Sequence, residues 1–258
     1  MTTQDLSKMG SARVSVEILD GVECVLKQGA SKIELCFYQE VAPKLVGVNS
    51  PALLKIEGSN LYIERIANTI SLDELRNRSD LYFQLASIHL SKYRPVVPVK
   101  THRWTTIDTH EALGTLGFSG EVASAIERLQ SISSQIFEYD TLISGDTNDG
   151  NWGTRNNGEL VLFDWERFGQ GSPAIDLAPL VKGLGRISDY EKIISQYIEH
   201  NTAISETKLL EHLIIAKCWI VIEVVNILVR RNNPEKNKYI NWFQANIPKW
   251  LTSVETAL

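Results

Sequence analysis

Three side chains, Asp146, Asn151 and Asp164, are of the types that bind metal ions and orient hydroxyl groups. Asp146 and Asn151 lie five residues apart in a glycine-containing loop, and Asp164 follows 13 residues later, after the apolar segment 160–163. Residues 156–158, Asn-Asn-Gly, are typical of a turn, so we expect a hairpin that brings Asp164 back beside Asn151. Carboxylate and amide oxygens suit Mg²⁺ better than Zn²⁺. With Asp146 placed to meet a substrate hydroxyl, the pattern predicts phosphoryl transfer.

The same loop would also be compatible with an ordinary turn or a calcium site. Asp, Asn and Gly are common in turns, so residues 146–150 alone would indicate no more than a loop. Asp146 and Asn148 occupy the first and third positions of a calcium-binding loop. However, its sixth position is Asn151 rather than glycine and its twelfth is Asn157 rather than glutamate. The ordered series of loop, hairpin and Phe-Asp-Trp favours phosphoryl transfer.

A helix start follows the hairpin. Ser172 is a favourable N-cap and Pro173 a favourable first helical residue. Asp176 then lies in the first turn, where the helix dipole stabilises a carboxylate. This position alone would account for Asp176 structurally.

Together, these segments resemble the signature of the aminoglycoside phosphotransferase and choline kinase family. The signature is His-Gly-Asp-x4-Asn, an apolar strand ending in Asp, and Gly-x-Pro-x-x-Asp-Leu-Ala or a close variant. The matching residues here are Ser144-Gly145-Asp146 with Asn151, Phe163-Asp164-Trp165-Glu166, and Gly171-Ser172-Pro173-Ala174-Ile175-Asp176-Leu177-Ala178.

The resemblance implies a protein-kinase-like, two-lobed α+β fold. It makes Asp146 the catalytic aspartate, Asn151 and Asp164 the magnesium ligands, and Asp176 a buried carboxylate that supports the catalytic loop. Ser144 stands where the family usually has a histidine that supports the same loop. A serine can still hydrogen-bond to the backbone, so we expect a competent site.

The resemblance also implies a nucleotide-binding lysine, Lys27, at the end of a strand, held by a helix carboxylate. Glu34 is the favoured partner, in the pattern Glu-Leu-Cys-Phe-Tyr. Alternatively, Glu34 forms a capping box with Ser31 and serves only the helix start. Glu40 is an alternative partner for Lys27, although it lies on a different helical face.

Further nucleotide contacts are expected from two segments of the N-terminal region. Residues 9–14, including Ser11, resemble the phosphate-covering turn of the family, although they contain a single glycine. Residues 61–66 resemble the hinge, where backbone groups of Glu64 and Ile66 would bind the adenine.

The elements that must position these residues change in character along the chain. Residues 12–26 alternate in polarity and turn at Asp20-Gly21, which predicts a hairpin. A helix over 31–45 and two strands within 51–66 follow. The later pattern is mainly helical, apart from the β-rich island 151–168. The predicted helices cover 79–92, 120–139, 173–184, 189–200, 207–230 and 234–251. We therefore expect a nucleotide-binding lobe over 1–66 and a catalytic and substrate-binding lobe over 67–258.

Composition limits the class of protein. With 26 basic and 31 acidic residues the net charge is −5, which argues against a nucleic-acid binder and is compatible with a cationic substrate. The three cysteines are far apart, and the start of the chain does not resemble a signal peptide. The apolar stretch 213–229 has 17 residues and includes Lys217 and Glu223, so a core helix is favoured over a membrane span. We expect a cytoplasmic protein without a membrane partner.

The sequence thus predicts a kinase that uses ATP or GTP with Mg²⁺ to phosphorylate a hydroxyl of a small molecule. The acceptor is aminoglycoside-like, choline-like or sugar-like, and the sequence leaves this choice and the oligomeric state open. A protein kinase is disfavoured because 11 residues separate Asp164 from Asp176, too few for a peptide-docking activation segment. A nucleotide-binding pseudokinase is the alternative, with Ser144 as its best argument.

Overall fold

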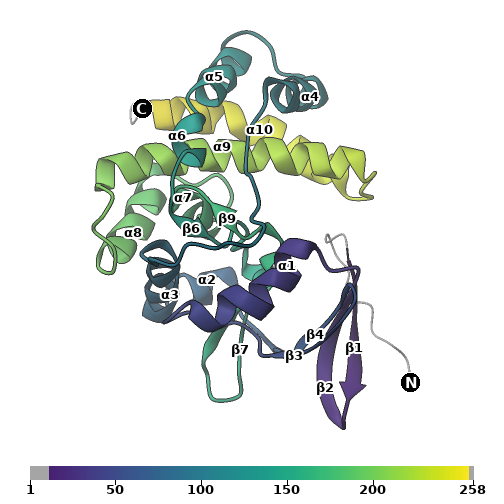
Figure 1. Ribbon diagram of the computed structural model, residues 1–258. Coiled ribbons are helices and arrows are strands. Elements are labelled where there is room, and N and C mark those ends of the chain that lie inside the picture. The colour runs from purple at the N-terminus through teal and green to yellow at the C-terminus, as the bar shows by residue number, and fades with distance from the viewer. Residues whose placement is uncertain (1–11, 256–258) are drawn as a thin grey trace. The chain divides into compact units, whose positions relative to one another are not determined.

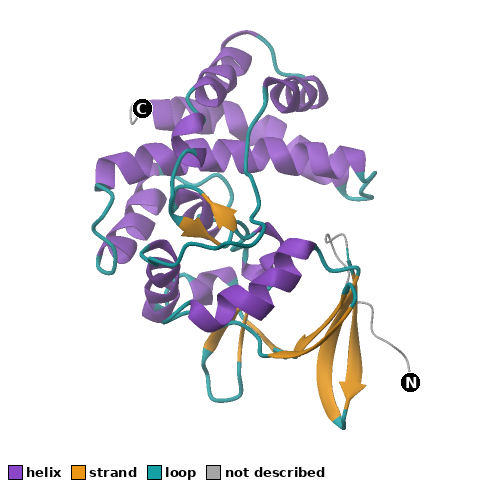
Figure 2. Cartoon of the chain, viewed as in Figure 1, coloured by secondary structure: helices purple, strands orange, loops and turns teal. Residues whose placement is uncertain are grey.

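The computed structural model describes residues 12–255 and forms two compact units. Among the described residues, the first unit contains 12–101 and 141–170, and the second contains 102–140 and 171–255. This division differs from the predicted lobes, because residues 67–101 and 141–170 group with the N-terminal sheet. Ser11 lies outside the described residues. The first unit carries the strands and the second is built from helices (Figure 2), which confirms the α+β class.

The first unit begins with a four-stranded antiparallel sheet in the order β1-β2-β4-β3 (Figure 1). Its strands are β1 Arg13–Leu19, β2 Val22–Gln28, β3 Leu53–Glu57 and β4 Asn60–Glu64. The predicted hairpin turn is present: Asp20 and Gly21 have φ angles of 52° and 82°, both positive, as a two-residue type I′ turn requires. Lys27 on β2 pairs in register with Leu61 on β4.

The predicted helix 31–45 forms, but it changes its winding twice. It begins as α1 (Lys32–Cys36), widens into the π-helical turn η1 (Phe37–Val41) and ends as the 3₁₀ turn η2 (Ala42–Lys44). Pro43 lies at the start of the last turn, where a missing N–H is tolerated. Two further helices of this unit are α2 (Leu72–Leu75) and α3 (Ser79–His89).

The first unit also contains two small sheets, and the predicted β-rich island contributes β7 and β8 to one of them. One has the order β5-β7-β8 and the other pairs β6 with β9. Their strands are β5 Asn68–Thr69, β6 Leu142–Ile143, β7 Trp152–Thr154, β8 Leu160–Leu162 and β9 Gly169–Gln170. The 3₁₀ turns η3 (Asp149–Asn151) and η4 (Trp165–Arg167) flank the β7–β8 hairpin.

The second unit is organised around the long helix α9 (Glu206–Arg230), which crosses it in Figure 1. The other helical elements are α4 Thr106–Leu116, α5 Gly120–Ser131, α6 Ser134–Phe137, α7 Ala174–Leu177, η5 Ala178–Leu180, α8 Ile187–Ile198 and α10 Lys236–Val254. α9 contacts α4, α5, α6, α7, α8 and α10. By length and composition α9 could cross a membrane, but 72% of its most apolar window is buried inside the protein, as in a core helix.

Helix α4 is absent from the elements predicted from the sequence. Its start has a full capping box, in which Thr105 and Asp108 each bond the other's backbone N–H, so the sequence does contain a local signal for it. The helix ends at Gly117, which has a positive φ of 65°. The predicted helix 120–139 is also divided, into α5 and α6.

Candidate functional site

The first unit brings Lys27 together with two carboxylates. The Lys27 side chain is buried, and its Nζ donates to Glu34 Oε1 at 2.6 Å and to Asp164 Oδ1 at 2.7 Å. Burial alone would lower the pKa of Lys27, but the two carboxylates outweigh it and the pKa is raised. The predicted Lys27–Glu34 pair is therefore present, and Asp164 joins it.

The direction of the Glu34 side chain decides between its two predicted roles. Ser31 Oγ accepts from the Glu34 backbone N–H at 3.2 Å, so half of a capping box forms, while the carboxylate bonds to Lys27. Glu40 lies in the π-helical turn and is exposed. Glu34 is fully buried, and its Oε2 accepts no hydrogen bond from the described residues. This burial raises the pKa of Glu34 to about 7, against the opposing charge of Lys27.

Aromatic packing connects α1 to the segment that follows Asp164. The rings of Phe37 and Trp165 are stacked, with centroids 3.9 Å apart and planes 10° apart. The ring centroids of Phe168 and Phe37 lie 5.2 Å apart, and their planes are tilted by 59°. All three rings are buried, so this cluster fixes the Glu34 helix against the Asp164 turn. This role of the three rings is not predicted from the sequence.

Asp164 adopts an unusual backbone conformation at the end of the hairpin. Its φ is 66°, in the left-handed region that non-glycine residues rarely adopt. This conformation starts η4 and lets the carboxylate turn toward Lys27. Such a conformation costs on the order of 1 kcal/mol or more and is typical of functional sites.

The predicted return of the hairpin is confirmed. Trp152 pairs with Leu162, and Phe163 N–H donates to Asn151 O at 3.0 Å, which places Asp164 one residue beyond this bond. The Asn151 amide nitrogen donates to the backbone oxygen of Asp146 at 3.0 Å. The loop and the hairpin therefore bring Asp146, Asn151 and Asp164 into one unit.

The Asp146 carboxylate is held within its own loop. Asn148 Nδ2 donates to Asp146 Oδ1 at 2.6 Å, and Asn148 Oδ1 accepts from Gly150 N–H at 2.9 Å. Burial raises the pKa of Asp146, although the Asn148 bond and the charge of Arg167 act in the opposite direction. Asn148 therefore holds the Asp146 carboxylate within the loop, whereas the sequence places Asn148 only at the third position of a calcium-binding loop, an interpretation that the sequence itself disfavours.

The site has an excess of negative charge. Glu166 joins Glu34, Asp146 and Asp164, and burial together with Asp164 raises the pKa of Glu166. Within residues 12–255 no group of three or more His, Cys, Asp or Glu side chains could hold a metal by itself. The Asn151 and Asp164 pair would therefore need phosphate or water oxygens to complete a magnesium shell, as is usual for this ion.

The two residues predicted to support the catalytic loop lie in different units. Ser144 is fully buried in the first unit, just after β6. Asp176 is fully buried in the second unit, in the first turn of α7. Their supporting roles stay predictions.

The predicted hinge begins at the end of β4. Glu64 N–H donates to Ala52 O at 2.8 Å, and Ile66 lies half-buried in the segment after the strand. The Glu64 carboxylate binds Arg155 through two hydrogen bonds of 2.7 Å each. Arg155 was not among the predicted site residues, because an arginine beside a predicted turn carries no distinguishing signal.

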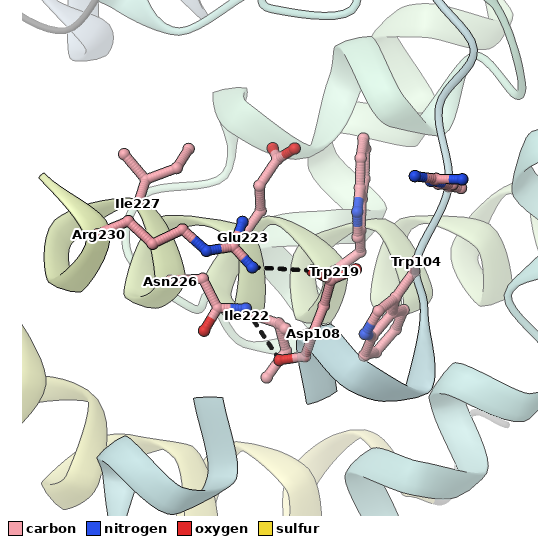
Figure 3. Close-up of a pocket in the computed structure, with 9 residues that line it drawn as sticks. Trp104, Asp108, Trp219, Ile222, Glu223, Asn226, Ile227 and Arg230 are labelled. Carbon is pink, nitrogen blue, oxygen red and sulfur yellow. Dashed lines mark hydrogen bonds and ion pairs between the residues drawn. The ribbon is translucent and has the colours of Figure 1, made fainter. Parts of the chain in front are cut away.

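The second unit contains a pocket of about 130 Å³ on one face of α9 (Figure 3). The helix contributes Trp219, Ile222, Glu223, Asn226, Ile227 and Arg230, and the pocket is completed by Arg103, Trp104 and Asp108. The spacing of three and four residues places the α9 side chains on one helical face.

The charges around this pocket are unevenly distributed. Arg230 pairs with Glu111 at 2.7 Å and with Asp108 at 3.4 Å. In Figure 3 the Glu223 carboxylate points away from the Arg230–Asp108 pair, and Trp219 and Trp104 lie on the side of the pocket away from Arg230. The lining thus contains two arginines, two carboxylates and two buried indoles, and Arg230 is paired with Asp108 and Glu111.

Comparison with known proteins assigns the fold. No protein-family model matches the sequence, and no curated protein matches it. Solved structures do match over nearly the whole chain, and they are kinase-like small-molecule phosphotransferases. The chain therefore has the kinase-like fold that the sequence predicts.

Three of these structures illustrate the likeness. Choline kinase LicA from Streptococcus pneumoniae has a TM-score of 0.68 and 15% identity, over 98% of this chain and 94% of its own. The GDP and kanamycin complex of APH(2")-IIia has a TM-score of 0.67 and 15% identity, over 96% and 93%. Macrolide 2'-phosphotransferase MphH from Brachybacterium faecium has a TM-score of 0.63 and 13% identity, over 95% and 91%. At these identities the likeness establishes the fold.

Proposed function

We propose that this protein is a kinase that transfers the terminal phosphoryl group of ATP or GTP to a hydroxyl of a small molecule. The observation that carries the proposal is the Lys27–Glu34 and Lys27–Asp164 pairing in the same unit as the Asp146–Asn151 loop. A structural ion pair would need neither the loop nor the left-handed Asp164. The combination supplies a cation for phosphates, oxygen ligands for a metal and a carboxylate for the nucleophile.

Each residue has a separate task in this proposal. Lys27 binds the nucleotide phosphates, and Glu34 holds its ammonium in place. Asp146 accepts or orients the proton of the acceptor hydroxyl, with Asn148 fixing the carboxylate. Most of the rate enhancement then comes from positioning and from neutralised charge rather than from covalent chemistry.

Asn151 and Asp164 are the residues that would hold Mg²⁺. The Asn151 amide nitrogen is committed to Asp146 O, so its oxygen is left to face a cation. Asp164 bonds Lys27 through Oδ1, so Oδ2 can serve as a ligand. The ion would neutralise charge that develops on the phosphate oxygens. The excess of carboxylates in the site favours such a cation.

The nucleotide base would lie against the segment 64–66. In support, one similar structure is LicA in complex with AMP, and another is the GDP and kanamycin complex of APH(2")-IIia. The two nucleotides differ in their base, so we propose ATP or GTP for this chain. Thermal unfolding with each nucleotide should show which one stabilises the protein more.

We further propose that the acceptor is a small hydroxylated amine, and that the α9 pocket of the second unit can bind a molecule of this class. A cavity of about 130 Å³ is close in size to one that holds a benzene-sized molecule, about 150 Å³. A multi-ring aminoglycoside needs far more room than this. Calorimetric titration of small amino alcohols against uncharged alcohols of equal size would test the preference. Equal affinities for the two series would contradict it.

The test of the proposed activity is the Asp146→Asn variant, with Asp149→Asn as the matched control. Asp149 is exposed in the same loop. Because a positioned proton acceptor contributes about 10²- to 10⁴-fold, Asp146→Asn should lose at least about 100-fold in nucleotide turnover. Asp149→Asn should keep wild-type turnover, and both should unfold at the wild-type temperature.

Two results would contradict the proposal. If Asp146→Asn turned over nucleotide at the wild-type rate, Asp146 would not be the catalytic carboxylate. If the wild type bound nucleotide with Mg²⁺ but showed no turnover that depends on Asp146, the pseudokinase alternative would hold.

A further inference from the structure

Arg155, between β7 and β8, bonds through every nitrogen of its guanidinium. Nε and Nη2 bind the two carboxylate oxygens of Glu64 at 2.7 Å each, and Nη2 also donates to Ser50 O at 3.0 Å. Nη1 donates to Glu159 Oε2 at 2.6 Å. Bidentate arginine–carboxylate bonds are strong and fix direction as well as distance. The hairpin is thereby joined to the last residue of β4.

A second set of contacts holds the segment after β4 against the same hairpin. Strand β5 pairs with β7, with Thr69 opposite Gly153, and Asn68 Nδ2 donates to Thr154 O at 3.0 Å. A Cβ atom on Gly153 would lie 2.7 Å from both Asn68 O and Ile66 Cγ2. The close approach therefore requires glycine at this position, and residues 64–69 contact the hairpin on its β7 side, at residues 153–156.

These contacts join the two ends of the proposed nucleotide site. Glu64 and Ile66 belong to the segment proposed for the base. Asn151 and Asp164, at the other end of the hairpin, are the residues proposed for the metal. Arg155 links the two ends without any need to touch the nucleotide itself.

We propose that Arg155 is a positioning residue that fixes the spacing between the base-binding segment and the metal-binding end of the hairpin. This role rests on the proposed function. The guanidinium acts through Glu64 and leaves the nucleotide contacts to other groups. A lysine could replace its charge but not its paired hydrogen bonds.

A ligand that spans both ends depends on their spacing, whereas a ligand that occupies one end does not. MgATP places its base and its metal-bound phosphates at opposite ends, and adenosine has the base and sugar alone. When two linked groups bind a preorganised site, a spacing error lowers the affinity of the linked ligand selectively. Loss of Arg155 should therefore weaken the binding of MgATP more than the binding of adenosine.

The experiment compares Arg155→Gln with Glu159→Gln in the full chain. Glu159→Gln removes the ion pair on Nη1 and leaves both bonds to Glu64. Calorimetry gives the dissociation constants of adenosine and MgATP for each protein. We expect Arg155→Gln to weaken the binding of MgATP about fivefold to tenfold, which corresponds to a loss of about 1 kcal/mol. The binding of adenosine should weaken less than about twofold. Glu159→Gln should change neither by more than about twofold.

Arg155→Lys covers the case in which Arg155→Gln does not fold. This variant should fold, and it should weaken the binding of MgATP about twofold to threefold. That effect lies between the wild type and the effect expected for Arg155→Gln. Hydrogen exchange at residues 64–69 should be faster in Arg155→Lys than in Glu159→Gln.

Equal weakening of MgATP and adenosine by Arg155→Gln or Arg155→Lys would overturn the inference, because a general loss of structure affects both ligands. Unchanged binding of both would also overturn it, while leaving the proposed kinase function in place. If the wild type bound neither ligand, the proposed function would fail and the inference with it.

Discussion

Lys217 is a buried lysine whose environment makes a quantitative prediction about stability. It lies on α9 in the core of the helical unit, and its Nζ donates to Val181 O at 2.8 Å. Burial lowers the pKa of Lys217 to about 7 from its ordinary value of 10.5. Between these values the unfolded chain holds the lysine proton and the folded chain does not. The free energy of unfolding therefore rises with pH across this window.

The size of the effect follows from the two pKa values. Below pH 7 the folded protein carries the buried charge at a cost of about 5 kcal/mol, at about 1.4 kcal/mol per pKa unit. Lys217→Met removes this cost, but it leaves the Val181 carbonyl without its donor, which costs about 2 kcal/mol. The variant should be more stable than the wild type by about 3 kcal/mol at pH 6, and the gain should reach zero near pH 9.

Urea unfolding followed by tryptophan fluorescence at several pH values from 6 to 9.5 measures this gain. Lys249→Met, at an exposed position on α10, is the control and should stay within about 0.5 kcal/mol of the wild type. A constant gain for Lys217→Met at all pH values would refute the reasoning, because a gain caused by the lysine charge must vary with its titration. A variant less stable than the wild type at pH 6 would also refute it.

Two further predictions concern the proposed activity. Glu34→Gln removes the charge that holds Lys27, so kcat/KM for the nucleotide should fall about tenfold, while Glu40→Gln should not change it. Equal kinetics for the two variants would show that the Lys27–Glu34 pair is structural. Glu223→Gln should weaken binding of a small amino alcohol about fivefold, with the exposed Glu206→Gln as control. If Glu223→Gln weakened the binding of an uncharged alcohol as much as that of the amino alcohol, Glu223 would shape the pocket and would not bind the cation.

The close approach of Asp146, Asn151 and Asp164 could be predicted because these residues are near one another in sequence. Asp146 and Asn151 share one loop, and a short hairpin returns the chain to Asp164. The turn residues at 20–21 and 156–158 mark both hairpins, since few residue types adopt the required backbone angles. A short connection leaves few alternative registers, so spacing alone predicts that these three residues come together.

Relations between distant segments could not be predicted in the same way. The resemblance favoured Glu34 over Glu40 as the partner of Lys27, but no local pattern indicates the stacking of Phe37 on Trp165. The Glu64–Arg155 pair joins residues 91 positions apart, and no local pattern indicates it. The helix α4 is a different case, because the capping box at Thr105 is a local signal from which its start could have been predicted.

The residues of the proposed transfer site and those of the α9 pocket belong to different units. Lys27, Glu34, Asp146, Asn151 and Asp164 all belong to the first unit. The α9 pocket belongs to the second unit, whose helices supply its lining. Substitutions on the exposed side of the pocket can therefore change the ligand without altering the ion pairs and the hairpin of the first unit. The proposal of a small hydroxylated amine therefore rests on the size and lining of the α9 pocket and not on the fold.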